Sequence, residues 1–221
     1  MRYALVLLIA MFATVPHQAT FANEKPVAIL VALDMSGSTH EEPKFGGQLP
    51  SNFQIATIQN ALGRVYTNNL CRVPFRISIH YWGDSFRVAV PWTTISSQLS
   101  FETYLRNLSL LRTKGLLQDG HAYAYKWIVD ELQKTSGAHL FGLIMTEGSV
   151  SATPFLPTQE EVNHANEGIT LYGAGILDPH AALFFKSFAD HWMFSRDNPD
   201  QVSAFVHEAF QEALMANCPY S

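Results

Sequence analysis

The sequence is poor in charge and in cysteine. Of its 221 residues only 15% are charged, and fourteen Lys and Arg against nineteen Asp and Glu give a formal net charge of −5. A chain without a basic stripe cannot neutralise a row of phosphates, so nucleic-acid binding is not supported. The two cysteines, Cys71 and Cys218, are too few for a disulfide framework, and their spacing matches no zinc or redox motif.

Long apolar runs are also scarce. Arg2 precedes an apolar run that ends at Val15, which is shorter than the roughly 20 residues that a bilayer requires. Polar and then small residues lead to Ala22, and this order is typical of a secretory signal peptide. We therefore expect a signal peptide over 1–22 and a single domain over 23–221, exported to a periplasm or secreted, without a stable membrane anchor.

The remaining pattern alternates between strands and helices. Continuous apolar runs, typical of strands covered on both faces, occupy 27–33, 139–145 and 169–176. Apolar residues at helical spacing predict helices that begin near residues 51, 100, 121 and 199. Two segments of alternating polarity, 75–79 and 86–90, are joined by a short connection and indicate an antiparallel hairpin at a sheet edge. We expect an α/β fold: a doubly wound, mainly parallel sheet with one antiparallel edge hairpin and helices on both faces.

Local signals mark two helix starts. Ser51 with Gln54 three residues later forms a capping-box pattern, and Asn198 before Pro199 is a typical N-cap with proline at the first helical position. The four tryptophans fall in apolar patterns and are expected in the core: Trp82, Trp92, Trp127 and Trp192.

The chemistry of the chain concentrates in the segment DMSGS, which directly follows the first apolar strand. Asp34, Ser36 and Ser38 bring one carboxylate and two hydroxyls to the end of that strand. In parallel sheets ligands bind at the carboxyl ends of the strands. The carboxylate and the two hydroxyls are hard oxygen donors of the type that Mg²⁺, Ca²⁺ and Mn²⁺ prefer. The alternative is a loop in which Asp and Ser only cap turns.

The order of these features resembles the von Willebrand factor type A domain. A strand, DMSGS, a helix, the hairpin YWGDSFRVAVPW, a strand closed by Thr146-Glu147-Gly148 and a strand containing GAGI follow one another across the mature chain. In that family a D-x-S-x-S string, a Thr on a second loop and an Asp on a third form a metal-ion-dependent adhesion site. The resemblance therefore assigns Asp34, Ser36 and Ser38 to a divalent cation.

The sequence departs from the family pattern at two ligand positions. Leu117 stands where the coordinating Thr belongs, and Asp119, two residues later, either supplies an oxygen instead or caps the following helix. Glu147 replaces the Asp of the third loop. It either binds the cation or is a solvated carboxylate at a strand end.

What the resemblance implies is a non-enzymatic adhesion module. A bound divalent cation, Mg²⁺ first and Mn²⁺ or Ca²⁺ as alternatives, would keep one coordination position open for an acidic side chain of a protein partner. A second hypothesis is a metal-free type A scaffold. A third, a phosphohydrolase resembling the haloacid dehalogenases with Asp34 as nucleophile, would need an acid where Ser36 stands.

The expected topology also bears on the cysteines. The helix after the first strand and the final helix should both run from the carboxyl edge of the sheet to the opposite edge. Cys71 closes the former and Cys218 follows the latter. We therefore predict a disulfide between them.

Overall fold

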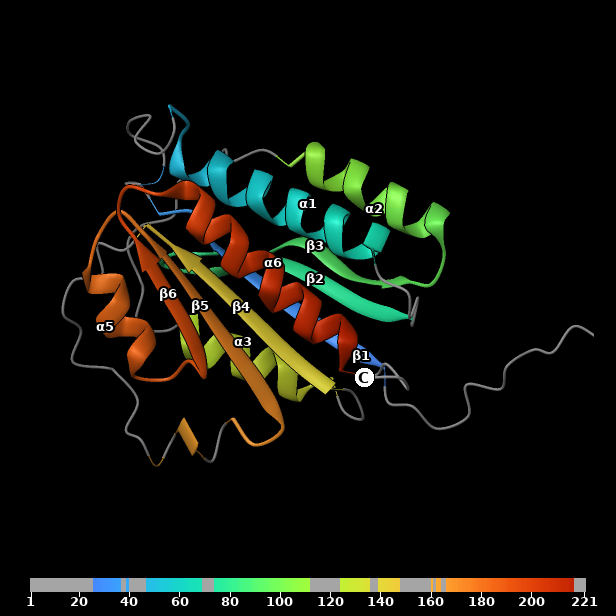
Figure 1. Cartoon of the computed structure of the whole chain (residues 1–221). Coiled ribbons are helices and arrows are strands. Elements are labelled where there is room, and N and C mark those ends of the chain that lie inside the picture. The colour runs from blue at the N-terminus through green and yellow to red at the C-terminus, as the bar shows by residue number, and fades with distance from the viewer. Residues whose placement is uncertain are drawn as a thin grey trace, which may run out of the picture.

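The computed structural model describes residues 26–36, 39, 47–68, 74–111, 124–135, 139–147, 160, 162–163 and 166–216 (Figure 1). Its elements, in chain order, are β1 (Val27–Asp34), α1 (Pro50–Asn68), β2 (Phe75–Trp82), β3 (Phe86–Ile95), α2 (Gln98–Ser109), α3 (Ala124–Gln133), β4 (His139–Thr146), β5 (Ile169–Ile176), α5 (His180–Lys186), β6 (His191–Ser195) and α6 (Pro199–Met215). The proposed signal peptide, 1–22, lies outside the described residues.

The strands of the described chain form one six-stranded sheet in the order β3-β2-β1-β4-β5-β6. All neighbouring strands are parallel except β2 and β3, which form the antiparallel edge hairpin. Helices α1, α2 and α6 cover one face, and α3 and α5 cover the other (Figure 1). The predicted fold class is confirmed.

The central strand β1 shows why its sequence lacks alternation. Every residue of β1 is buried. Val31 and Leu33 join the core beneath α1 and α6, whereas Leu30 and Ala32 join the core beneath α3 and α5. Because both faces are covered by helices, both sets of side chains must be apolar. This places the end of β1, at Asp34, in the middle of the carboxyl edge of the sheet.

One predicted helix start is confirmed and the other is wrong. The Asn198 side chain accepts hydrogen bonds from the second and third residues of α6, as expected of an N-cap. The Ser51–Gln54 capping box does not form, because α1 begins at Pro50 and so includes Ser51, whose hydroxyl has no hydrogen-bond partner in the described part of the chain. The Gln54 carboxamide instead bonds to the backbone of Asp34.

Helix α5 and strand β6 were not predicted. Both are short, and their place depends on tertiary contacts with β5. An added Cβ at Gly173 would lie 2.3 Å from the ring of Phe185, and one at Gly175 would lie 2.7 Å from the Cβ of Ala181. The glycines of β5 therefore allow α5 to pack directly on the sheet.

The tryptophans divide between core and surface. Trp82 is fully buried, whereas Trp92 and Trp127 are only partly buried. The expectation is wrong for Trp192, which is 40% exposed because it lies on β6, the edge strand of the sheet. In the described part of the chain, no helix is both long and apolar enough to cross a membrane.

A buried histidine makes the fold sensitive to acid. His80 on β2 is 3% exposed, and its ring lies tilted against that of Phe86, with the ring centroids 4.5 Å apart. The ring shares a 2.9 Å hydrogen bond with Ser78 Oγ. Burial lowers the pKa of His80 below its usual 6.5, against the opposing effect of Glu131. The folded state therefore binds this proton less readily than the unfolded state.

We expect the free energy of unfolding to fall as the pH drops below 6.5. The slope from His80 is at most about 1.4 kcal/mol per pH unit, down to the lowered folded-state pKa. Urea unfolding between pH 7.5 and 5 measures it, and His80→Gln should flatten this part of the profile. An equal pH dependence in wild type and variant would show that His80 is not responsible.

Candidate metal centre

Where β1 and β4 end, the Thr146 hydroxyl bonds to the Asp34 carboxylate, and Ser36 and Glu147 follow these two strands along the chain. The two strands are parallel neighbours with Leu33 opposite Met145, so that the next residues, Asp34 and Thr146, also lie side by side. We call Asp34, Ser36, Thr146 and Glu147 the strand-end cluster. All four are buried, with Asp34 0% and Glu147 5% exposed.

The carboxylate of Asp34 is fixed through both oxygens. Oδ1 accepts a 2.9 Å hydrogen bond from the backbone N–H of Ser36, and Oδ2 accepts a 2.6 Å hydrogen bond from the hydroxyl of Thr146. These two bonds orient the carboxylate at the strand end. Carboxylate oxygens are among the ligands that hard divalent cations prefer.

Sequence reasoning did not select Thr146 as a site residue. Its role follows from the register of β1 and β4, two strands separated by 112 positions at this contact. The signal was present in the string Thr146-Glu147-Gly148, which ends a predicted apolar strand just as Asp34 ends the first one.

The backbone of Asp34 is held from the side of α1. Its N–H donates to Gln54 Oε1 at 3.0 Å, and its carbonyl accepts from Gln54 Nε2 at 3.2 Å. On the other side, the N–H of Met35 donates to the carbonyl of Trp82 at 3.0 Å. The start of the DMSGS segment is thus fastened both to α1 and to β2.

The Gln54 contact gives a testable stability effect. Gln54→Ala would leave the buried N–H and C=O of Asp34 without these partners, so we expect it to lower the free energy of unfolding by about 2 kcal/mol. Chemical denaturation measures the change. Gln98→Ala, which removes an exposed glutamine from α2, is the control and should change stability by less than about 0.5 kcal/mol. Equal effects would contradict a special role for Gln54.

Glu147 lies at the end of β4 and is almost completely buried. Its backbone carbonyl accepts a 3.1 Å hydrogen bond from the N–H of Asp178, which follows β5. This burial differs from the solvated carboxylate that was one alternative for the residue. Two carboxylates, those of Asp34 and Glu147, are therefore buried at neighbouring strand ends.

The remaining predicted ligands lie outside the described residues. These are Ser38 and Asp119. Leu117, which stands where the family has a coordinating Thr, also lies outside them. The structure brings Asp34, Ser36 and Glu147 to one edge of the sheet, and the assignment of all five residues as cation ligands stays a prediction.

The residues present fit a hard divalent cation. The strand-end cluster offers carboxylate and hydroxyl oxygens, which suit Mg²⁺, Mn²⁺ or Ca²⁺. Burying carboxylates is costly, and a bound cation would lower that cost. Within the described ranges, no group of three His, Cys, Asp or Glu side chains is placed to hold a metal ion.

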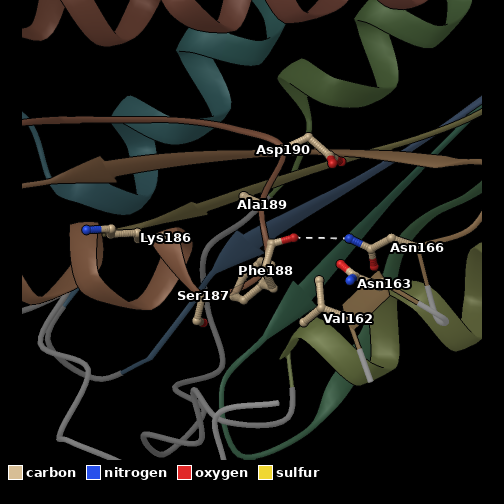
Figure 2. A pocket seen from close by; sticks show the side chains of 8 residues that line it. All are labelled: Val162, Asn163, Asn166, Lys186, Ser187, Phe188, Ala189 and Asp190. Atoms are coloured by element: carbon tan, nitrogen blue, oxygen red, sulfur yellow. Dashed lines mark hydrogen bonds between the residues drawn. The ribbon is translucent and has the colours of Figure 1, made fainter. Parts of the chain in front are cut away.

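A pocket of about 390 Å³ lies at the opposite end of the sheet from the strand-end cluster (Figure 2). It forms between the residues that precede β5 and those that precede β6. The Asn166 side chain donates to the carbonyl of Phe188 at 3.0 Å and accepts from the Tyr125 hydroxyl at 3.0 Å. Asn166 therefore ties these segments together, far from the strand-end cluster.

Solved structures share this arrangement of strands and helices. The von Willebrand factor type A structure from Catenulispora acidiphila aligns with 86% of this chain at 13% identity and a TM-score of 0.59, covering 43% of its own chain. This chain has the von Willebrand factor type A fold. The resemblance drawn from the sequence is confirmed at the level of the fold.

Two further structures resemble the type A domain described here. BatB from Bacteroides thetaiotaomicron aligns with 85% of it at 12% identity and a TM-score of 0.60, over 98% of its own chain. Proximal thread matrix protein 1 of the mussel byssus, solved with a zinc-occupied MIDAS motif, aligns with 86% at 14% identity and a TM-score of 0.63, over 48% of its own chain. No family model and no curated protein matches the sequence.

Proposed function

We propose that this type A domain is an exported, non-enzymatic binding module that engages a protein partner through a divalent cation at the strand-end cluster. One observation carries the proposal. Asp34, the first residue of the D-x-S-x-S string, is fully buried at the end of β1, with its two carboxylate oxygens oriented by Ser36 and Thr146.

Asp34 and Ser36 would hold the cation, with Ser38, Asp119 and Glu147 as further donors. The ion is Mg²⁺ in the first instance, with Mn²⁺ and Ca²⁺ as alternatives. A hard cation short of ligands attracts a carboxylate, so the bound ion would supply the contact for an acidic side chain of the partner. The zinc-occupied MIDAS motif of the mussel matrix protein supports a divalent cation in this fold.

The second candidate is a metal-free type A scaffold. It is favoured by Leu117, which offers no oxygen where the family places a coordinating Thr. The phosphohydrolase hypothesis is the weakest, because Ser36 stands where that chemistry needs its second acid and its backbone N–H bonds to Asp34. Export through a signal peptide over 1–22 remains part of the proposal.

Calorimetric titration of three variants with Mg²⁺ and Mn²⁺ tests the assignment of the ligands. Glu147→Gln should weaken cation binding because it removes a charge while keeping length and polarity. Glu147→Asp should preserve or strengthen it, and Leu117→Thr should strengthen it by adding a hydroxyl.

Glu208→Gln, at an exposed position of α6, is the matched control and should leave the affinity unchanged. If Glu147→Gln binds as tightly as wild type, Glu147 is not a ligand and the site rests on Asp34, Ser36 and Ser38. That result would favour a metal-poor scaffold, with a site of fewer protein ligands.

A further inference from the structure

A strained turn follows β5 at the same edge of the sheet. Leu177 has a φ of +73°, and in the part of the chain that the structure describes no other residue except glycine has a positive φ. The N–H of Asp178 donates to the carbonyl of Ile176 at 3.0 Å, so Leu177 is the central residue of a rare γ-turn with positive φ. A bulky side chain in this region of φ is an outlier that persists only when its surroundings impose it.

The surroundings here are the ends of two neighbouring strands. The same N–H of Asp178 also donates to the carbonyl of Glu147 at 3.1 Å, and the N–H of Leu177 is 3.4 Å from the carbonyl of Ser195. The turn therefore joins the carboxyl ends of β4, β5 and β6 through backbone hydrogen bonds. The half-buried Leu177 side chain also packs against the core beneath α6.

The side chain of Glu147 makes a fixed backbone at this position especially important. It is one methylene longer than the Asp that the family pattern has at this position, and so it has one more rotatable bond. A longer side chain loses more conformational freedom when it binds, unless its backbone is fixed in advance. The bond from Asp178 fixes that backbone.

We infer that the Leu177–Asp178 turn is a positioning element that sets Glu147 for the cation. This inference rests on the proposed function and deepens it. Leu177 itself would not contact the cation. It acts through the hydrogen bond between the Asp178 N–H and the Glu147 carbonyl.

A double-mutant cycle with Leu177→Gly and Glu147→Gln tests the inference on the full chain. Glycine adopts positive φ without strain and frees the backbone. We expect Leu177→Gly to weaken Mg²⁺ binding about fivefold in the wild-type background and to have no further effect beside Glu147→Gln. Without added metal, amide hydrogen exchange at Asp178 should accelerate in Leu177→Gly, which a loss of packing elsewhere would not cause.

Leu105→Ala removes another partly buried leucine from the same core and should leave the Mg²⁺ affinity unchanged. If Leu177→Gly does not fold, Leu177→Ala replaces it, since alanine disfavours positive φ and lacks the core packing that imposes it on Leu177. If wild type binds Mg²⁺ and the Leu177 variant binds it with the same affinity, the inference is overturned and the proposed function is left intact. A wild-type protein that binds no divalent cation would overturn both.

Discussion

Replacing Asp34 with alanine is expected to abolish the rise in melting temperature that a divalent cation produces in the wild-type protein. A ligand that binds only the folded state stabilises it by RT ln(1 + [L]/Kd), which is about 2.7 kcal/mol at a hundredfold excess over Kd. Asp34 lies at the centre of the strand-end cluster, where Ser36 and Thr146 orient its carboxylate. The alanine variant should therefore lose the whole of this term.

Melting curves with and without Mg²⁺, Mn²⁺ and Ca²⁺ measure the effect. Asp84→Ala is the matched control, because it removes the same charge from an exposed position in the connection between β2 and β3. Its cation-dependent shift should equal that of wild type. If wild type and Asp34→Ala respond alike to every ion, the cation hypothesis is wrong. Binding weaker than millimolar would instead support the metal-free scaffold.

Reduction of the protein is expected to lower its stability by up to about 5 kcal/mol, through loss of a disulfide between Cys71 and Cys218. Closing a loop of 218 − 71 + 1 = 148 residues removes this much chain entropy from the unfolded state. Both cysteines lie outside the described residues, so the pairing remains a prediction.

The ends of two helices support that pairing. Helices α1 and α6 lie against each other and run in the same direction across the sheet (Figure 1). Asn68, the last residue of α1, and Met215, the last of α6, line one cavity of about 190 Å³. Each cysteine follows three residues later, and three extended residues reach roughly 10 Å.

Intact mass before and after reduction and alkylation decides the question. Cys71→Ser and Cys218→Ser should each cost as much stability as reduction does, and the double variant should be indifferent to reductant. Two free thiols in the unreduced protein would contradict the prediction.

The sequence was sufficient to predict the fold because its strongest signals are local. Strands β1, β4 and β5 are continuous apolar runs, and the alternating segments of β2 and β3 have a short connection. The D-x-S-x-S string directly after β1 placed Asp34 and Ser36 at the carboxyl edge, where the structure has them. Each of these features can be read within about ten residues.

The parts that were missed depend on contacts between distant residues. Gln54 fits a capping-box pattern, but it bonds to a backbone 20 positions earlier, and that tertiary contact replaces the local one. Thr146 reaches Asp34 only through the register of two strands. Helix α5 and β6 are too short to show a clear period, and their packing depends on the room that Gly173 and Gly175 leave on β5.

The Gln54 contact has a mechanical consequence. Helix α1 lies along α6, which is the last helix of the described chain, and Gln54 connects α1 to the backbone of Asp34 through two hydrogen bonds. A tensile force applied at the C-terminal end of α6 would therefore reach the strand-end cluster by two routes, through the packing of α6 on the sheet and through α1 and the Gln54 side chain. Gln54→Ala would remove the second route and leave the first intact.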